Sequence, residues 1–282
     1  MSFPQYQYFN VSSPEKWVAH VEINRAEKLN AFSEPMWLEI RRVFENLSDD
    51  AAVRSIVFSG SGDKAFCAGL DVDYAATPGS FFNPDSKDKA DAARYAARVR
   101  RFAYEFQDCI SSIERCEKPV ICVLHGVSIG LAVDIACCAD LRVCTSNVTF
   151  AVKEVDIGLA ADIGSLTRLP KIVGSYAWVK EVSLTARNFG AQEALRVGFV
   201  NSVFQTKAEA MSEALRLAKI MASKSPVAVQ GTKNFLDWSR DHDIMTGLRY
   251  TAVWNGAAVN TTDIPVAMAS MRQKKVPTFE KL

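Results

Sequence analysis

A run of five apolar residues, Val120 to Leu124, constrains most strongly what this chain can fold into. Pro119 stands directly before the run, and proline ends a helix that precedes it. An apolar run without alternation is typical of a strand that is buried on both faces, as in a parallel sheet covered by helices. The run therefore predicts an α/β core.

Other segments predict strands and helices that alternate along the chain. Residues 17–24 alternate between apolar and polar side chains, as expected of a half-buried strand. From Tyr95, apolar residues recur at gaps of three and four, which predicts one apolar face of a helix that ends before Pro119. Helices are also predicted over 33–47, where Ser33-Glu34-Pro35 forms the start, and over 130–138, and strands over 53–59 and 140–144. Strands and helices that alternate at intervals of roughly 30 to 40 residues indicate α/β units.

Two further regions do not follow this alternation of strands and helices. Residues 75–90 are polar and rich in proline, glycine and serine, which predicts a surface loop. Segments 192–198, 208–224 and 227–239 have the helical pattern of apolar residues. They predict a mainly helical C-terminal region, with a boundary near 195–210.

Composition and charge argue against several classes of protein. The formal net charge of +1 gives no basic field for nucleic acid, and no apolar run reaches membrane-spanning length. We therefore expect neither nucleic acid nor a membrane as a partner.

The seven cysteines include no C-x-x-C pair, and the three histidines are scattered. This pattern predicts buried reduced thiols and no metal site.

The two ends of the sequence bear on the compartment. The last three residues, Glu280-Lys281-Leu282, resemble the peroxisomal address Ser-Lys-Leu, with glutamate in place of the small residue. Residues 1–14 have neither the apolar core of a secretory signal nor the arginines of a transit peptide. We expect the peroxisome, with the mitochondrion or the cytoplasm as alternatives.

Three segments combine glycine-containing turns with carboxylates. They are Phe66-Cys-Ala-Gly-Leu-Asp71, His125-Gly-Val-Ser-Ile-Gly-Leu-Ala-Val-Asp134 and Lys153-Glu-Val-Asp-Ile-Gly-Leu-Ala-Ala-Asp162. Glycine between a strand and a helix lets backbone N–H groups face a ligand, and two such turns can form an oxyanion hole. Carboxylates in apolar surroundings have raised pKa values, which suits proton transfer near neutral pH.

Each carboxylate also has a structural explanation. Asp134 fits the first turn of a helix, and Asp162 fits the N-cap of a helix that begins near Ile163. Glu154 fits the exposed end of a strand. Asp140 is assigned a structural role.

In combination, these segments resemble the enoyl-CoA hydratase/isomerase (crotonase) superfamily. The resemblance covers nearly the whole chain and includes Asn24-Arg-Ala-Glu-Lys-Leu-Asn-Ala-Phe32, Lys118-Pro-Val-Ile121 and Gly190-Ala-Gln-Glu-Ala-Leu-Arg-Val-Gly-Phe-Val-Asn201. It implies an α/β fold with a spiral of ββα units as the catalytic core over 1–200. It also implies a C-terminal helical trimerisation region over 201–282, and a homotrimer or homohexamer.

The resemblance further implies how an acyl-CoA thioester is bound, with no cofactor apart from the CoA of the substrate. The N–H groups of Leu70 and Leu131 are implied as the oxyanion hole, and Leu131 stands where the family usually has glycine. Substrate or CoA contacts are implied for Arg25, Lys28, Lys64, Ala68, Gly69 and Gly130. Solvated lysines are an equally good interpretation of Lys28 and Lys64.

The carboxylates indicate a branch of the superfamily. Hydratases carry two glutamates twenty residues apart, and the matching positions here hold Asp134 and Glu154 (154 − 134 = 20). The shorter Asp134 and the additional Asp162 resemble the Δ3,5-Δ2,4-dienoyl-CoA isomerase branch, in which a proton moves from C2 to C6. The resemblance implies that Glu154 removes the C2 proton, Asp162 protonates C6 and Asp134 supports or polarises the site. Four apolar residues are expected to keep Asp162 protonated: Val155, Ile157, Leu159 and Ile163.

Alternatives stay open at this point. A Δ3-Δ2-enoyl-CoA isomerase needs essentially one acid and leaves Asp162 unexplained, and a hydratase requires Asp134 to replace a glutamate. A non-catalytic family member that binds acyl-CoA or RNA is the alternative from a different class.

Overall fold

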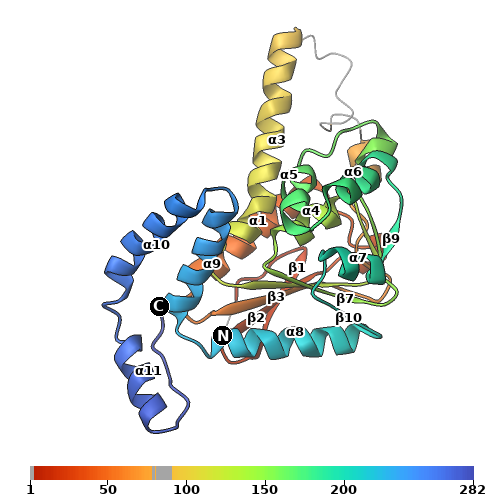
Figure 1. Ribbon diagram of the computed structural model, residues 1–282. Coiled ribbons are helices and arrows are strands. Elements are labelled where there is room, and N and C mark those ends of the chain that lie inside the picture. Colours follow the sequence, from red (N-terminus) through yellow and green to blue (C-terminus); the bar gives the residue numbers. More distant parts are fainter. Residues whose placement is uncertain (1–2, 78–79, 81–90) are drawn as a thin grey trace.

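The computed structural model describes residues 3–77, 80 and 91–282 (Figure 1). The strands in these residues are β1 Phe9–Glu15, β2 Val18–Ile23, β3 Ser55–Gly60, β4 Ala65–Cys67, β5 Val120–Leu124, β6 Val127–Ile129, β7 Leu141–Thr145, β8 Thr149–Ala151, β9 Phe189–Gly190 and β10 Ser202–Phe204. The α-helices are α1 Glu34–Asp49, α2 Val72–Ala75, α3 Ala92–Arg115, α4 Leu131–Cys138, α5 Ser165–Ile172, α6 Tyr176–Thr185, α7 Ala191–Val197, α8 Lys207–Ala222, α9 Pro226–Arg240, α10 Ile244–Ala258 and α11 Asp263–Arg272. Two short 3-10 helices are η1 Ala26–Lys28 and η2 Glu154–Ile157.

The main sheet of the described residues has the strand order β1-β2-β3-β5-β7-β10. β1 and β2 are antiparallel, and each later pair of neighbours is parallel. All five residues of β5 are buried, and the strand lies between β3 and β7. The apolar run therefore forms an interior parallel strand, as its sequence predicted.

Helices cover both faces of this sheet. α8 lies along one face, where Val57 of β3 packs against a row of buried alanines spaced four residues apart: Ala210, Ala214, Ala218 and Ala222 (Figure 1). Ile56 and Phe58 belong to the core on the opposite face, because successive strand residues alternate in direction. α1, α3 and α4 contribute to this second and larger core.

A smaller sheet in the described residues, with the order β4-β6-β8-β9, carries the segments predicted to be functional. β4, β6 and β8 are parallel to one another. The carboxyl ends of parallel strands lie at the same edge of a sheet, so the residues that follow these three strands come together. Those residues are Ala68–Leu70, Gly130–Leu131 and Lys153–Glu154.

The predicted helices and strands are confirmed, with small differences at their ends. β1, β10, α2, α6, α10, α11 and the smaller sheet were not predicted individually, and a helix near α5 was considered only as one that Asp162 would cap. Each strand of the smaller sheet has only two or three residues, too few to show alternation. The predicted loop over 75–90 lies largely outside the described residues. All seven cysteines are buried and unpaired, as predicted.

The C-terminal part is mainly helical (Figure 1), but β10 and α8 pack on the main sheet. The proposed boundary at residue 200 stays a prediction. In the described residues, no helix is long and apolar enough to cross a membrane. The same residues contain no cluster of three histidine, cysteine, aspartate or glutamate side chains suited to a metal ion.

Candidate active site

A cavity of about 310 Å³ opens at the carboxyl ends of β4, β6 and β8. Its walls are mainly apolar, and all three predicted carboxylates reach it. The lining residues come from the three turns, from α3 and from the segment after β8: Ala68, Gly69, Leu70, Val72, Val99, Phe102, Ala103, Phe106, Ile129, Gly130, Leu131, Asp134, Lys153, Glu154, Ile157, Leu159, Asp162 and Ile163. An apolar cavity with a few convergent polar groups is the usual form of a small-molecule site.

Two glycine turns meet at the floor of this cavity. Gly69 has φ +92°, and a Cβ built there would lie 3.1 Å from the Ile129 carbonyl oxygen and 3.8 Å from the Leu131 nitrogen. Gly130 has φ +56°, and a Cβ there would lie 3.8 Å from the Gly69 Cα. Positive φ favours glycine at both positions, and at Gly69 a Cβ would also crowd the Ile129 carbonyl oxygen.

The residues after these glycines present two free backbone donors. Leu131 is the first residue of α4, where N–H groups have no partner within the helix. Among the described residues, neither the Leu70 nor the Leu131 N–H donates a hydrogen bond. Both residues line the cavity. Two such donors facing one cavity can bind an oxygen that carries negative charge, and their role as an oxyanion hole stays a prediction.

Asp134 is the most deeply buried of the three carboxylates, with 1% of its surface exposed. It lies in the first turn of α4, and its Oδ1 accepts a hydrogen bond of 2.5 Å from the Ser165 N–H. Burial raises the pKa of Asp134 to about 7, and the nearby charge of Glu154 adds to the increase. Asp134 can therefore exist in either protonation state near neutral pH.

Replacement of Asp134 by asparagine is expected to stabilise the protein at pH 8. Between the ordinary pKa of 3.8 and about 7, the unfolded chain releases this proton while the folded chain retains it. The free energy of unfolding therefore falls as pH rises through this window. Asparagine cannot ionise. We therefore expect the free energy of unfolding of Asp134→Asn to exceed that of wild type by roughly 2–4 kcal/mol at pH 8. Urea unfolding at pH 5, 6, 7 and 8 measures the difference, and a difference that does not grow with pH would contradict this account.

Glu154 and Asp162 complete the group of acids. Glu154 begins η2, three residues after the last residue of β8, and a Cβ built at Gly130 would lie 3.6 Å from its Oε1. Its Oε2 is buried and has no hydrogen-bond partner among the described residues. Burial raises the pKa of Glu154, and the charge of Asp162 contributes. Asp162 is more exposed and follows in the loop before α5, where partial burial also raises its pKa.

One predicted apolar neighbour of Asp162, and one structural explanation for Asp162 itself, differ from the structure. Val155 was expected in the apolar surroundings of Asp162, but η2 turns it outward and it does not line the cavity. Ile157, Leu159 and Ile163 do line it. Asp162 does not cap a helix, because α5 begins at Ser165 with Gly164 as its N-cap.

Sequence reasoning missed the wall that α3 supplies. The apolar face of this helix was predicted. Its Val99, Phe102 and Phe106 line the cavity, and Phe102 and Phe106 also contact the core. Phe106 stacks on Trp37 of α1, with ring centroids 3.9 Å apart. Lys153 was also missed; it lines the cavity while its Nζ donates to the Ala186 carbonyl.

The cationic residues predicted to contact CoA have different surroundings. Arg25 Nη1 lies 2.7 Å from Asp71 Oδ2 and donates to the Ala31 carbonyl, so its guanidinium holds the turn next to Leu70. Lys28 Nζ lies 2.7 Å from Asp73 Oδ2 at the surface. Lys64 is exposed. None of the three lines the cavity, whereas Ala68, Gly69 and Gly130 do.

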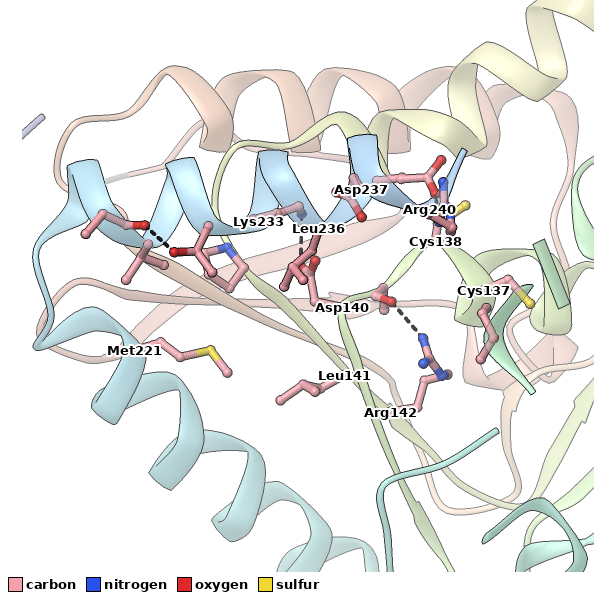
Figure 2. Close-up of a pocket in the computed structure, with 17 residues that line it drawn as sticks. Cys137, Cys138, Asp140, Leu141, Arg142, Met221, Lys233, Leu236, Asp237 and Arg240 are labelled. Carbon is pink, nitrogen blue, oxygen red and sulfur yellow. Dashed lines mark hydrogen bonds and ion pairs between the residues drawn. The ribbon is translucent and has the colours of Figure 1, made fainter. Parts of the chain in front are cut away.

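A second cavity, of about 470 Å³, lies between α9, α8 and the junction of α4 with β7 (Figure 2). Four of its charged residues form two ion pairs: Lys233 Nζ is 2.9 Å from Asp140 Oδ2, and Arg240 Nη1 is 2.8 Å from Glu114 Oε1. Asp140 also accepts a hydrogen bond from the Val120 N–H, which agrees with its predicted structural role. None of the three candidate acids lines this cavity, so the first cavity is the candidate active site.

The first cavity combines the groups needed to move protons on a bound carbonyl compound. Two backbone donors can stabilise charge on the carbonyl oxygen, and Glu154 and Asp162 can exchange protons with the carbon chain. The apolar wall of α3 suits a hydrocarbon tail.

Comparisons with known proteins agree with this geometry. The chain matches the family model described as enoyl-CoA hydratase/isomerase over residues 14–281. It is 41% identical over 280 residues to the mitochondrial Delta(3,5)-Delta(2,4)-dienoyl-CoA isomerase of Mus musculus, covering 98% of this chain and 84% of the mouse protein. It is 38% identical to the peroxisomal Delta(3,5)-Delta(2,4)-dienoyl-CoA isomerase of Arabidopsis thaliana, covering 94% of this chain and 93% of that protein. A solved enoyl-CoA hydratase from Bacillus anthracis shares the fold, with a TM-score of 0.86, 23% identity and coverage of 97% of this chain and 99% of that chain.

Proposed function

This chain belongs to the enoyl-CoA hydratase/isomerase family and has its crotonase-like fold, and we propose that it acts as a Δ3,5-Δ2,4-dienoyl-CoA isomerase. Relatives named for this activity match nearly the full length of the chain at 38–41% identity. The substrate is an acyl-CoA thioester with double bonds at C3 and C5, and the product has them at C2 and C4. The enzyme thus serves the oxidation of unsaturated fatty acids.

The proposed mechanism uses two proton carriers. Ionised Glu154 removes a proton from C2, and the electron pair of that C–H bond enters the conjugated system as an enolate. The N–H groups of Leu70 and Leu131 stabilise the enolate oxygen. Protonated Asp162 then delivers a proton to C6, which leaves double bonds at C2 and C4. Asp134 supports the site from the first turn of α4, where its Oδ1 accepts the hydrogen bond from the Ser165 N–H.

The observation that carries this proposal is the third carboxylate in the same cavity. Asp162 and Glu154 both line it, and the pKa of each is raised. A proton shift between C2 and C6 spans four carbon–carbon bonds, so two separated acids are better placed than one. An enoyl-CoA isomerase leaves Asp162 without a role, and a hydratase requires the buried, shorter Asp134 to position water.

A substrate panel tests the proposal directly. Purified protein is assayed with 3,5-dienoyl-, 3-enoyl- and 2-enoyl-CoA of the same chain length. We expect the fastest turnover on the 3,5-dienoyl thioester. The absorbance of the 2,4-dienoyl product measures this turnover. Faster hydration of the 2-enoyl thioester would favour a hydratase, and binding without turnover of any thioester would favour the non-catalytic alternative.

The oxyanion hole can be tested by removing one backbone donor. Leu131 occupies the first position of α4, where proline is tolerated, and Gly130 before it lacks the Cβ that proline would crowd. We expect Leu131→Pro to lower kcat by about 10²–10³ with KM less affected. Leu131→Ala is the matched control, because it removes the buried side chain but keeps the N–H. Equal losses in both variants would contradict the role of the donor.

We also propose that the protein assembles through its C-terminal helices as a homotrimer or homohexamer. α10 and α11 stand away from the sheets in Figure 1, and they expose large apolar side chains, among them Ile244 (80%), Val253 (77%) and Met271 (73%). Exposed apolar surface of this kind favours association. Light scattering after size-exclusion chromatography gives the number of subunits.

The peroxisome is the compartment that we propose from the terminal Glu280-Lys281-Leu282. The Arabidopsis relative is named as peroxisomal and the mouse relative as mitochondrial, so both compartments occur among relatives of this chain. A fluorescent protein carrying the last ten residues, with and without Leu282, tests whether the tripeptide directs import.

A further inference from the structure

The loop between Asp162 and Ser165 carries two groups of the proposed machinery. Asp162 supplies the acid for C6, and the Ser165 N–H donates to Asp134. This loop is held from outside the cavity, because Gln107 Nε2 of α3 donates a hydrogen bond of 2.6 Å to the Asp162 carbonyl oxygen. The side chain of Gln107 therefore contacts the backbone of the residue whose carboxyl group is proposed to protonate C6.

Gln107 is the first of three polar residues on one face of α3. Ser111 and Glu114 follow at i+4 and i+7, which places them along the same face of a helix. Both contact Arg168 of α5. Glu114 Oε2 accepts from Arg168 Nε at 3.0 Å and from Nη2 at 2.8 Å, and the Ser111 hydroxyl accepts from Nη2 at 2.9 Å.

The Glu114–Arg168 pair fixes the far end of the loop. The side chains of both residues are largely buried, at 18% and 14% exposed, and buried charge-assisted pairs hold their geometry well. The guanidinium also lies close against Gly164, where a Cβ would collide with Nη1. Arg240 of α9, labelled in Figure 2, adds a second ion pair of 2.8 Å to Glu114.

We propose that Gln107 is a positioning residue that sets the reach of the Asp162 carboxyl group toward C6, with the Glu114–Arg168 pair holding the rest of the loop. This inference rests on the proposed isomerase function. Glu154 lies on η2 and makes no hydrogen bond to α3 among the described residues. Gln107 therefore acts on the second proton transfer and leaves the first one intact.

The test separates the two proton transfers in one experiment. Wild type and Gln107→Leu are incubated with 3,5-dienoyl-CoA in D₂O, and both product formation and deuterium entry at C2 of the recovered substrate are measured. We expect Gln107→Leu to lower kcat for the product about 10- to 100-fold, since small misplacements of a catalytic group have effects of this size. KM and the rate of C2 exchange stay close to wild type.

Two further variants keep the test specific. Gln107→Lys retains a donor that can reach the carbonyl, so we expect it to recover most of the product rate. Glu105→Leu changes an exposed residue of α3 that makes no hydrogen bond within the described residues, and we expect wild-type rates. If Gln107→Leu loses exchange and product formation equally, or loses neither, the role of Gln107 is overturned and the proposed function is not. Absence of product with wild type would overturn the proposed function itself.

Discussion

Replacement of Glu154 by glutamine is expected to lower kcat on 3,5-dienoyl-CoA by about 10³-fold, because general base catalysis contributes about this much. Glutamine has nearly the same size but cannot accept the C2 proton. The wild-type carboxylate is suited to the task, since its Oε2 is buried without a partner among the described residues and burial raises its pKa. The rise of 2,4-dienoyl absorbance measures the effect.

Asp156 provides a matched control for this variant. It lies two residues later on the same 3-10 helix, does not line the cavity and pairs with Lys153 at 3.0 Å near the surface. We expect Asp156→Asn to retain turnover close to wild type. A Glu154→Gln variant that keeps more than about a tenth of the wild-type kcat would exclude Glu154 as the base.

Replacement of Asp162 by asparagine is expected to lower kcat by about 10²–10⁴, because the proton for C6 must then come from water or from a less well-placed group. Asparagine keeps the size and the backbone contact to Gln107 but has no acidic proton. Asp162 is exposed enough that the change should alter the free energy of unfolding by less than about 0.5 kcal/mol. Thermal unfolding checks that the variant is intact, and a kcat within a few-fold of wild type would contradict the assignment.

The two glycine turns could be predicted from the sequence because their signals are local. Gly69 and Gly130 each stand between a strand and a helix, and glycine at such a position indicates a backbone that approaches a ligand. The carboxylates were recognised by their spacing and their apolar neighbours. The parallel arrangement of β4, β6 and β8 brings them together, and these short strands were not predicted from the sequence.

The parts that were not predicted depend on contacts between distant residues. Gln107 lies 55 positions from Asp162, and the Ser165 N–H lies 31 positions from Asp134, so no local pattern marks either contact. Val155 was placed wrongly because a 3-10 helix turns successive side chains to different sides, which an apolar sequence alone does not indicate. The α3 wall was predicted as an apolar helical face, but periodicity does not distinguish a cavity from a core.

Deuterium exchange at C2 of 3,5-dienoyl-CoA, measured for wild type, Asp162→Asn and Glu154→Gln in D₂O, tests the two-carrier mechanism most directly. We predict that Asp162→Asn exchanges the C2 proton at a rate close to wild type while forming almost no 2,4-dienoyl product, and that Glu154→Gln loses both processes. Loss of C2 exchange in Asp162→Asn, or product formation without exchange in Glu154→Gln, would contradict the assignment of the two proton transfers to these two acids.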